Sequence, residues 1–167
     1  YYIPMILIEL TSIFTGLRDG ITLPYILNVL YFTLMVGICE EVFYRGLMLK
    51  TLSIKGSKYA VIAGSIIFGI THLGNLAGGA NMTYTILQVV FATLFGFVCA
   101  ELVIITRSII YVIFFHFLHD FIAYISVDSL NRTIDYVILG IQMVLLLLYA
   151  VYLWFKISEE KMEVEIR

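Results

Sequence analysis

Three ionisable residues, Glu40, Glu41 and Arg45, lie inside an otherwise hydrophobic segment of the chain. Residues 26–39 before them carry no charged side chain, and residues 46–49 after them are apolar again. A charged side chain in hydrocarbon costs at least ~2.5–3.5 kcal/mol, so such residues usually face a cavity and serve a function. Two adjacent carboxylates and a guanidinium therefore indicate the centre of an active site.

The spacing of these residues suggests different tasks for the two glutamates. Glu41 and Arg45 are separated by four positions, so they can pair on one face of a helix. Glu40 is rotated by about 100° from Glu41 and is free to point elsewhere. A carboxylate beside a second carboxylate in a medium of low dielectric suits a general base acting on water. His116 and Asp120 repeat the four-residue spacing later in the chain.

The elements that must position these groups are membrane helices. The chain has 167 residues, of which 62% are hydrophobic and 13% charged, whereas a soluble domain carries roughly 25% charged residues. We therefore expect an all-α, polytopic transmembrane bundle that forms one integral membrane domain over residues 1–167. Apolar windows near the ~20 residues that cross a bilayer predict six membrane segments, at 1–17, 23–49, 59–76, 83–106, 108–127 and 134–155.

Basic residues orient this bundle. Seven lysines and arginines fall on one side and two on the other, with Arg45 excluded as intramembrane. By the positive-inside rule, the loop at 50–58 and the C-terminal tail at 158–167 are cytoplasmic. We expect an integral protein of a bacterial cell membrane. The net charge of −2 gives no reason to expect a nucleic-acid partner.

Polar residues of three segments reach a similar depth. Counted at ~1.5 Å per residue from the basic residues of the cytoplasmic side, Glu40 lies ~15 Å deep and His72 ~21 Å. His116 and Asp120 lie ~13–20 Å deep on the same count. Their convergence predicts one polar site near the middle of the membrane. Glu101 is expected instead at the end of a segment, snorkelling or paired with Arg107.

These residues resemble the CAAX protease and bacteriocin-processing family of intramembrane proteases, also called the Abi family. The family's three signatures are EExxxR, FxxxH and HxxxN/D, on successive core helices. Here they read Glu40-Glu41 to Arg45, Phe68 to His72, and His116 to Asp120. The resemblance covers a catalytic core at about residues 35–124.

The resemblance implies hydrolysis of a peptide bond of a membrane-associated or leader-peptide substrate. Glu40 would activate water with help from His72, while His116 and Asp120 would stabilise the oxyanion. Glu41 and Arg45 would be structural and electrostatic. Because an ionised aspartate cannot donate a hydrogen bond, Asp120 either orients His116 or is protonated, and His119 is a candidate to assist it.

A metal is the open point of the mechanism. Two histidines and a glutamate could hold zinc with one position left for water, but the helical H-E-x-x-H pattern of zinc proteases is absent. A metal-free glutamate mechanism is favoured. The expected partners are a peptide or protein substrate in the membrane and the lipid bilayer. The sequence does not decide between prenylated proteins, pheromones and bacteriocin leaders.

Two other functions compete with proteolysis. A catalytically silent membrane regulator or scaffold would keep the fold and bind a partner membrane protein. A transporter or proton relay would also place Glu and His within the membrane, but the chain lacks the internal repeat that transporters often show.

Overall fold

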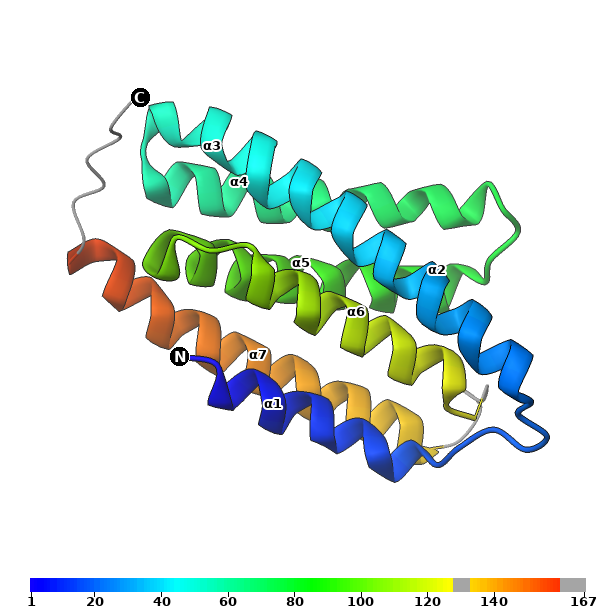
Figure 1. Ribbon diagram of the computed structural model, residues 1–167. Coiled ribbons are helices and arrows are strands. Elements are labelled where there is room, and N and C mark those ends of the chain that lie inside the picture. Colours follow the sequence, from blue (N-terminus) through cyan, green and yellow to red (C-terminus); the bar gives the residue numbers. More distant parts are fainter. Residues whose placement is uncertain (128–132, 160–167) are drawn as a thin grey trace.

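The apolar windows fold as helices because the backbone groups of a segment in hydrocarbon must be satisfied within that segment. A computed structural model describes residues 1–127 and 133–159 and shows a bundle of helices (Figure 1). The α-helices are α1 (Ile3–Leu10), α2 (Leu23–Glu41), α3 (Leu49–Leu52), α4 (Ser57–Thr71), α5 (Met82–Thr106), α6 (Ile110–Ile125) and α7 (Thr133–Glu159). A π-helix, η2 (Val42–Met48), links α2 to α3, and 3₁₀ turns are η1 (Thr11–Thr15), η3 (Ser53–Lys55) and η4 (His72–Leu76).

The predicted all-α membrane bundle is confirmed. Among the described residues, four helical stretches are long and apolar enough to cross a membrane: Leu23–Lys55, Ser57–Leu76, Met82–Thr106 and Thr133–Ile157. The apolar helix α6 is shorter, with 16 residues. The first predicted segment forms α1 and η1. The loop at 128–132 and most of the predicted cytoplasmic tail, 160–167, fall outside the described residues.

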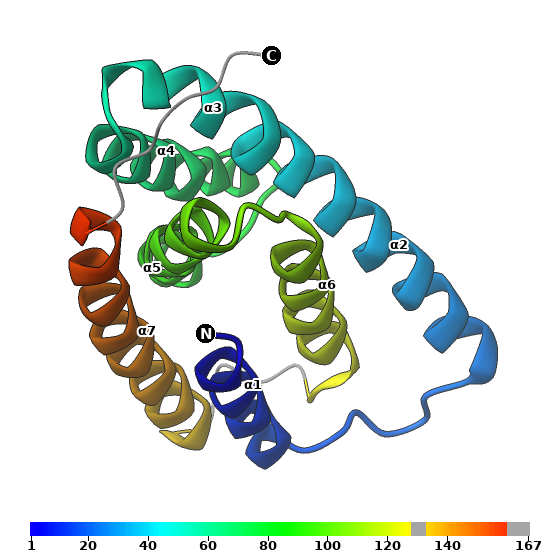
Figure 2. The ribbon, with the colours of Figure 1, turned by 60° about the vertical axis from the view of Figure 1, so that its left-hand side comes forward.

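Helix α5 lies at the centre of the bundle, with α4 and α7 on either side of it (Figure 2). Its close contact with α4 depends on Gly69, where a Cβ atom would lie 1.9 Å from Thr93 Oγ1 and 2.9 Å from the carbonyl oxygen of Val89. Phe68, Phe95 and Leu102 are among the buried residues of the main hydrophobic core. The core is thus built around α5, with the polar residues of the site at its edge.

Helices α2 and α6 also approach closely, and this contact brings two of the sequence signatures together. A Cβ atom at Gly37 would lie 3.2 Å from the backbone nitrogen of Phe117 and 3.3 Å from the carbonyl oxygen of Ile113. Gly37 lies one helical turn before Glu41, and His116 lies between Ile113 and Phe117. The missing side chain therefore allows the end of α2 to sit directly beside His116.

Helix α1 packs against α6 and α7 at the lower edge of the bundle in Figure 1. The ring of Tyr2 stacks on Tyr111 of α6 at 3.9 Å between centroids. Met5 and Ile8 are buried in the main core. Gln142 of α7 donates a 2.8 Å hydrogen bond to Ser12. These contacts hold α1 in place independently of its one acidic residue, Glu9.

Candidate active site

The two adjacent glutamates are the last residues of α2, immediately before the π-helix. A π-helix is rare and is frequently found at functional sites. The four-residue spacing predicts a continuous α-helix here, so the π-helix is a difference from the prediction. The predicted pair is nevertheless present, because Arg45 Nη1 lies 2.8 Å from Glu41 Oε1.

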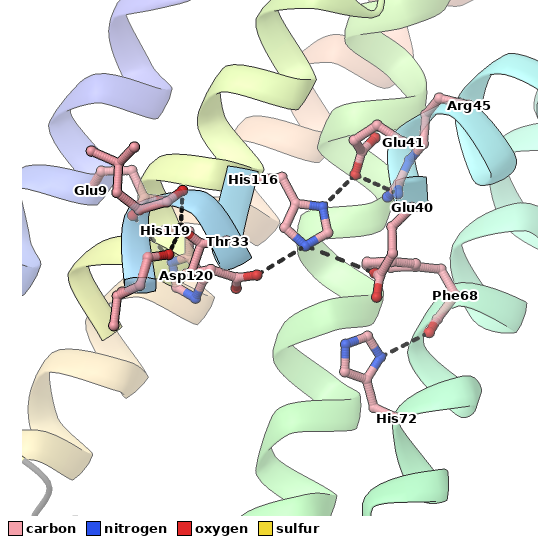
Figure 3. Close-up of polar contacts among 12 residues, drawn as sticks. Glu9, Thr33, Glu40, Glu41, Arg45, Phe68, His72, His116, His119 and Asp120 are labelled. Carbon is pink, nitrogen blue, oxygen red and sulfur yellow. Dashed lines mark hydrogen bonds and ion pairs between the residues drawn. The ribbon is translucent and has the colours of Figure 1, made fainter. Parts of the chain in front are cut away.

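Glu41 is fully buried and serves two partners with one oxygen. Its Oε1 accepts the hydrogen bond from Arg45 and a second from His116 Nδ1, at 2.7 Å (Figure 3). Glu41 therefore fixes the ring of His116 as well as pairing with Arg45. The spacing of the motif predicts only the pairing with Arg45, and the contact with His116 is the part that sequence reasoning misses.

Arg45 is buried with only 4% of its surface exposed, and its surroundings are adapted to its planar cation. The guanidinium carbon lies 4.2 Å from the centre of the Phe68 ring, which is a favourable cation–π geometry. Gly96 of α5 leaves space for the head group, since a Cβ atom there would lie 3.4 Å from Arg45 Nη2. Phe68 thus links the first signature to the second.

The other nitrogen of His116 faces two carboxylates that are more exposed than that of Glu41. Nε2 lies 3.8 Å from Glu40 Oε2 and 3.6 Å from Asp120 Oδ2. The side chain of Glu40 is 36% exposed and that of Asp120 is 27% exposed, against 7% for His116. The site therefore has a buried part, Glu41 with Arg45, and an accessible part, Glu40 with Asp120, joined by one imidazole.

His72 approaches Glu40 from the end of α4. Its Nδ1 lies 3.0 Å from the carbonyl oxygen of Phe68, and because a carbonyl can only accept, Nδ1 carries the proton. The Phe68 and His72 rings pack edge to face at 5.1 Å. Figure 3 shows the Glu40 carboxylate between the rings of His116 and His72, and Glu40 interacts electrostatically with both. The structure thus brings together all six residues predicted for the site.

A second acid–imidazole pair lies next to this cluster and comes from a helix that the signatures do not include. His119 Nδ1 of α6 is 3.1 Å from Glu9 Oε2 of α1 (Figure 3). Glu9 is buried, with 2% exposure. The only sequence signal of this contact is that Glu9 is an acidic residue inside the first apolar window, and this signal does not indicate which residue it pairs with. The orientation of His119, the residue before Asp120, thus depends on α1.

The expectation for Glu101 is wrong. Glu101 lies in α5 and is fully buried, and neither carboxylate oxygen has a hydrogen-bond partner among the described residues. Its position five residues before the end of α5 places it in the core instead of the interface. No ion pair with Arg107 joins the two residues in the part of the chain that the structure describes.

A cavity of about 810 Å³ opens beside the site. Asp120 and His119 contribute to its wall, and the wall includes polar side chains of η1, α2 and α5, such as Ser12, Asn28 and Gln88. Apolar side chains such as Phe32 and Ile122 complete the wall, so the space next to Asp120 has a mixed lining.

The ligand set that zinc would need is not assembled in this conformation. Within residues 1–127 and 133–159, no group of three or more His, Cys, Asp or Glu side chains has the spacing of a metal site. The nearest candidates are Glu40, His72 and His116, in which Nδ1 of each ring contacts Phe68 or Glu41, so Nε2 is the atom that a metal would need.

Comparison with known families gives one match. The family model described as "Type II CAAX prenyl endopeptidase Rce1-like" matches residues 22–122, which include the residues of all three signatures. No curated protein matches the chain, and no solved structure matches it.

Proposed function

Because the chain belongs to the Rce1-like family of type II CAAX prenyl endopeptidases, we propose that it is an intramembrane endopeptidase in which Glu40 activates the attacking water. The observation that carries the proposal is the meeting of Glu40, His72 and His116 from three helices beside a cavity of about 810 Å³. The family itself is a protease family. The assignment of each residue's role is our inference from the contacts.

Water is activated between Glu40 and His72. Nδ1–H of His72 donates a hydrogen bond to the Phe68 carbonyl. Nε2 of a neutral His72 therefore carries a lone pair and accepts a hydrogen bond from the water. Glu40 accepts the other hydrogen and takes that proton as the oxygen attacks the carbonyl carbon. The step forms one C–O bond and converts the carbonyl to a tetrahedral oxyanion.

The oxyanion is stabilised by His116. With Nδ1–H directed to Glu41, the ring can donate to an oxyanion only through a protonated Nε2. Glu41, Glu40 and Asp120 surround this ring, so its positive charge has acceptors on both sides. Asp120 is then an acceptor that directs the Nε2 proton, and it does not need to donate. As the C–N bond breaks, the proton held by Glu40 passes to the leaving amine.

The substrate is a membrane-associated or leader peptide, and the matched family makes a C-terminal prenylated cysteine motif the first candidate. Bacteriocin or pheromone processing remains a prediction from the signatures. The chain is oriented with its C-terminus in the cytoplasm, on the basis of its lysine and arginine distribution, in a bacterial cell membrane. The proposed mechanism includes no metal step.

The test compares the membrane peptidomes of cells that carry the intact protein or its Glu40→Gln variant. A precursor that accumulates only in the variant, and that the purified intact protein cleaves, identifies the substrate and the reaction together. Glu101→Gln is the matched control, because it makes the same chemical change in a carboxylate away from the site. We expect that control to process the precursor normally.

The proposal fails if Glu40→Gln and His72→Ala proteins both cleave the identified precursor at the parental rate. The alternative of a silent regulator or scaffold predicts a different result. In that case no precursor accumulates with Glu40→Gln, and the cellular phenotype is lost only when lipid-facing helix surfaces are changed.

A further inference from the structure

His119 has the same arrangement as His116 one helical turn earlier on α6. Each ring directs Nδ1 to a buried glutamate, Glu41 for His116 at 2.7 Å and Glu9 for His119 at 3.1 Å. The two glutamates come from opposite sides of α6, on α2 and α1. A carboxylate on Nδ1 fixes the ring and determines which nitrogen is left for a further partner.

The ring of His119 is also fixed by aromatic contacts. It stacks on Phe91 at 4.6 Å with an interplanar angle of 17°, and it lies 5.9 Å from the tilted ring of Phe95. The remaining polar atom, Nε2, has no hydrogen-bond partner among residues 1–127 and 133–159. The side chain is 24% exposed, and it lines the cavity next to Asp120.

The chemistry of the cavity indicates what this nitrogen binds. A peptide extended across the cavity brings backbone N–H and C=O groups into a region where unpaired polar groups are costly. The wall offers hydrogen-bonding side chains to such a strand, including Ser12, Asn28 and Gln88. Apolar side chains such as Phe32 and Ile122 lie between these polar groups in the wall. The polar groups can satisfy a peptide backbone while the apolar ones contact its side chains.

We propose that His119, held by Glu9, binds the backbone of the peptide substrate through Nε2, on the side of Asp120 that faces away from Glu40. Glu9 is then a positioning residue that acts through His119. This inference rests on the proposed function, and it adds α1 to the substrate site. Glu9 lies outside the residues 22–122 that match the family.

A purely structural role is the competing explanation, because the pair also connects α1 to α6. However, α1 is held by Met5 and Ile8 in the core and by the stacking of Tyr2 on Tyr111. A structural pair would affect the unfolding temperature and leave substrate affinity unchanged. The two roles are therefore separable by measurement.

Substitutions at His119 can remove one nitrogen at a time. In His119→Asn, the amide nitrogen takes the place of Nδ1 and keeps the contact with Glu9, while the atom in the cavity is lost. In His119→Gln, the amide reaches the position of Nε2 and the contact with Glu9 is lost. Leu7→Ala is the control, since Leu7 lies on the same helix as Glu9 and is 58% exposed.

Affinity is measured in the Glu40→Gln background, so that hydrolysis is not required. The probes are two fluorescein-labelled peptides that end in a Cys-aliphatic-aliphatic-X motif, one farnesylated and one not, and the readout is fluorescence anisotropy in detergent. We expect His119→Asn to raise Kd about 2- to 12-fold, the range for one hydrogen bond. The factor should be the same for both peptides, because the contact is to the backbone.

Further results are expected for the other variants and for the active protein. Glu9→Ala raises Kd by no more than His119→Asn does. The Kd of the double variant, with Glu9→Ala and His119→Asn together, is no higher than that of His119→Asn alone. His119→Gln recovers part of the affinity, and Leu7→Ala binds like the parent. In the active protein, His119→Asn raises KM and leaves kcat and the unfolding temperature unchanged.

The proposal is overturned if the Glu40→Gln protein binds neither peptide, or if His119→Asn binds both with parental affinity. It is also overturned if Glu9→Ala and His119→Asn lower only the unfolding temperature. Failure of the proposed function looks different. In that case the protein hydrolyses neither peptide, but the effect of His119→Asn on Kd remains.

Discussion

Glu41 Oε1 and His116 Nδ1 are joined by a 2.7 Å hydrogen bond between two buried side chains of different helices. The same oxygen is 2.8 Å from Arg45 Nη1. One carboxylate thus neutralises a cation within its own helix and orients an imidazole on the neighbouring one. The second glutamate of the motif therefore supports the site, and the first is left for the reaction.

The Glu41→Gln substitution should damage both stability and activity. It leaves the buried guanidinium of Arg45 without its charge partner, and breaking a buried pair in this way costs about 3–5 kcal/mol. His116 also loses its charged acceptor, so cleavage should fall by about a hundredfold or more, the size of losing one oxyanion donor. Thermal unfolding in detergent and turnover of the identified precursor measure the two effects.

Glu40→Gln is the comparison for that variant. The Glu40 side chain is 36% exposed and has no charge partner closer than 3.8 Å. The unfolding temperature of the Glu40→Gln protein should therefore stay near the parental value while cleavage is lost. Equal unfolding temperatures for Glu40→Gln and Glu41→Gln would contradict the division between an accessible and a buried carboxylate.

The Gly37→Ala substitution should separate α2 from α6. The added Cβ atom would lie 3.2 Å from a backbone nitrogen and 3.3 Å from a carbonyl oxygen of α6, and backbone atoms cannot move aside as a side chain can. Overpacking of this kind costs about 1–3 kcal/mol, and we expect kcat to fall with it because Glu41 moves away from His116.

Gly140→Ala is the control for this helix contact. Gly140 lies in α7, and outside its own stretch of helix no atom of the described residues is within 4 Å of an added Cβ. The alanine should therefore leave activity unchanged and raise stability by about 0.5–1 kcal/mol. A Gly37→Ala protein with parental kcat would show that the close approach of α2 to α6 is not needed for the site.

Replacement of Glu101 by methionine should stabilise the protein. Its carboxylate is buried, and neither oxygen has a partner in the described part of the chain, so the apolar side chain of similar size removes a desolvation cost of about 1–3 kcal/mol. Denaturation in detergent measures the change. A lower unfolding temperature for Glu101→Met would mean that the carboxyl group has a partner that these contacts do not include.

Chelation should leave cleavage intact. No group of three potential ligands is assembled among the described residues, and the proposed steps use Glu40, His72 and His116, with Glu41 and Asp120 directing His116. Protein dialysed against 1,10-phenanthroline is expected to cleave the precursor at the rate of an untreated sample. A loss of activity that is restored by zinc and by no other divalent ion would replace the glutamate mechanism with a metal one.

The orientation can be tested with single cysteines. In a protein without Cys39 and Cys99, Lys55→Cys should react with a membrane-impermeant maleimide only after the cells are opened. Ala77→Cys, which follows η4 at the opposite end of the helical stretch Ser57–Leu76, should react in intact cells. The reverse pattern of labelling would put the C-terminus outside the cytoplasm.

The sequence predicts the bundle well and also predicts that the six candidate residues reach a similar depth, because both inferences depend on local rules. Hydrophobic windows determine the helices, and the depth of a residue follows from its count along a helix, as for Glu40 and His116. The contacts of Glu9 and Glu101 are not predicted, because they depend on how α1 and α5 rotate against their neighbours. The joint use of Glu41 by Arg45 and His116 depends on the distance between α2 and α6, which Gly37 determines.

The π-helix at Val42–Met48 restricts how the length of this region can vary. In a surface loop, one added or deleted residue is absorbed locally, but within a helix it rotates everything beyond it by roughly a quarter of a turn. A deletion between Glu41 and Arg45 would turn the guanidinium away from both its carboxylate and the Phe68 ring. The fixed spacing of the EExxxR signature is therefore a matter of register, and a homologue with a gap at this point would be expected to have lost the reaction.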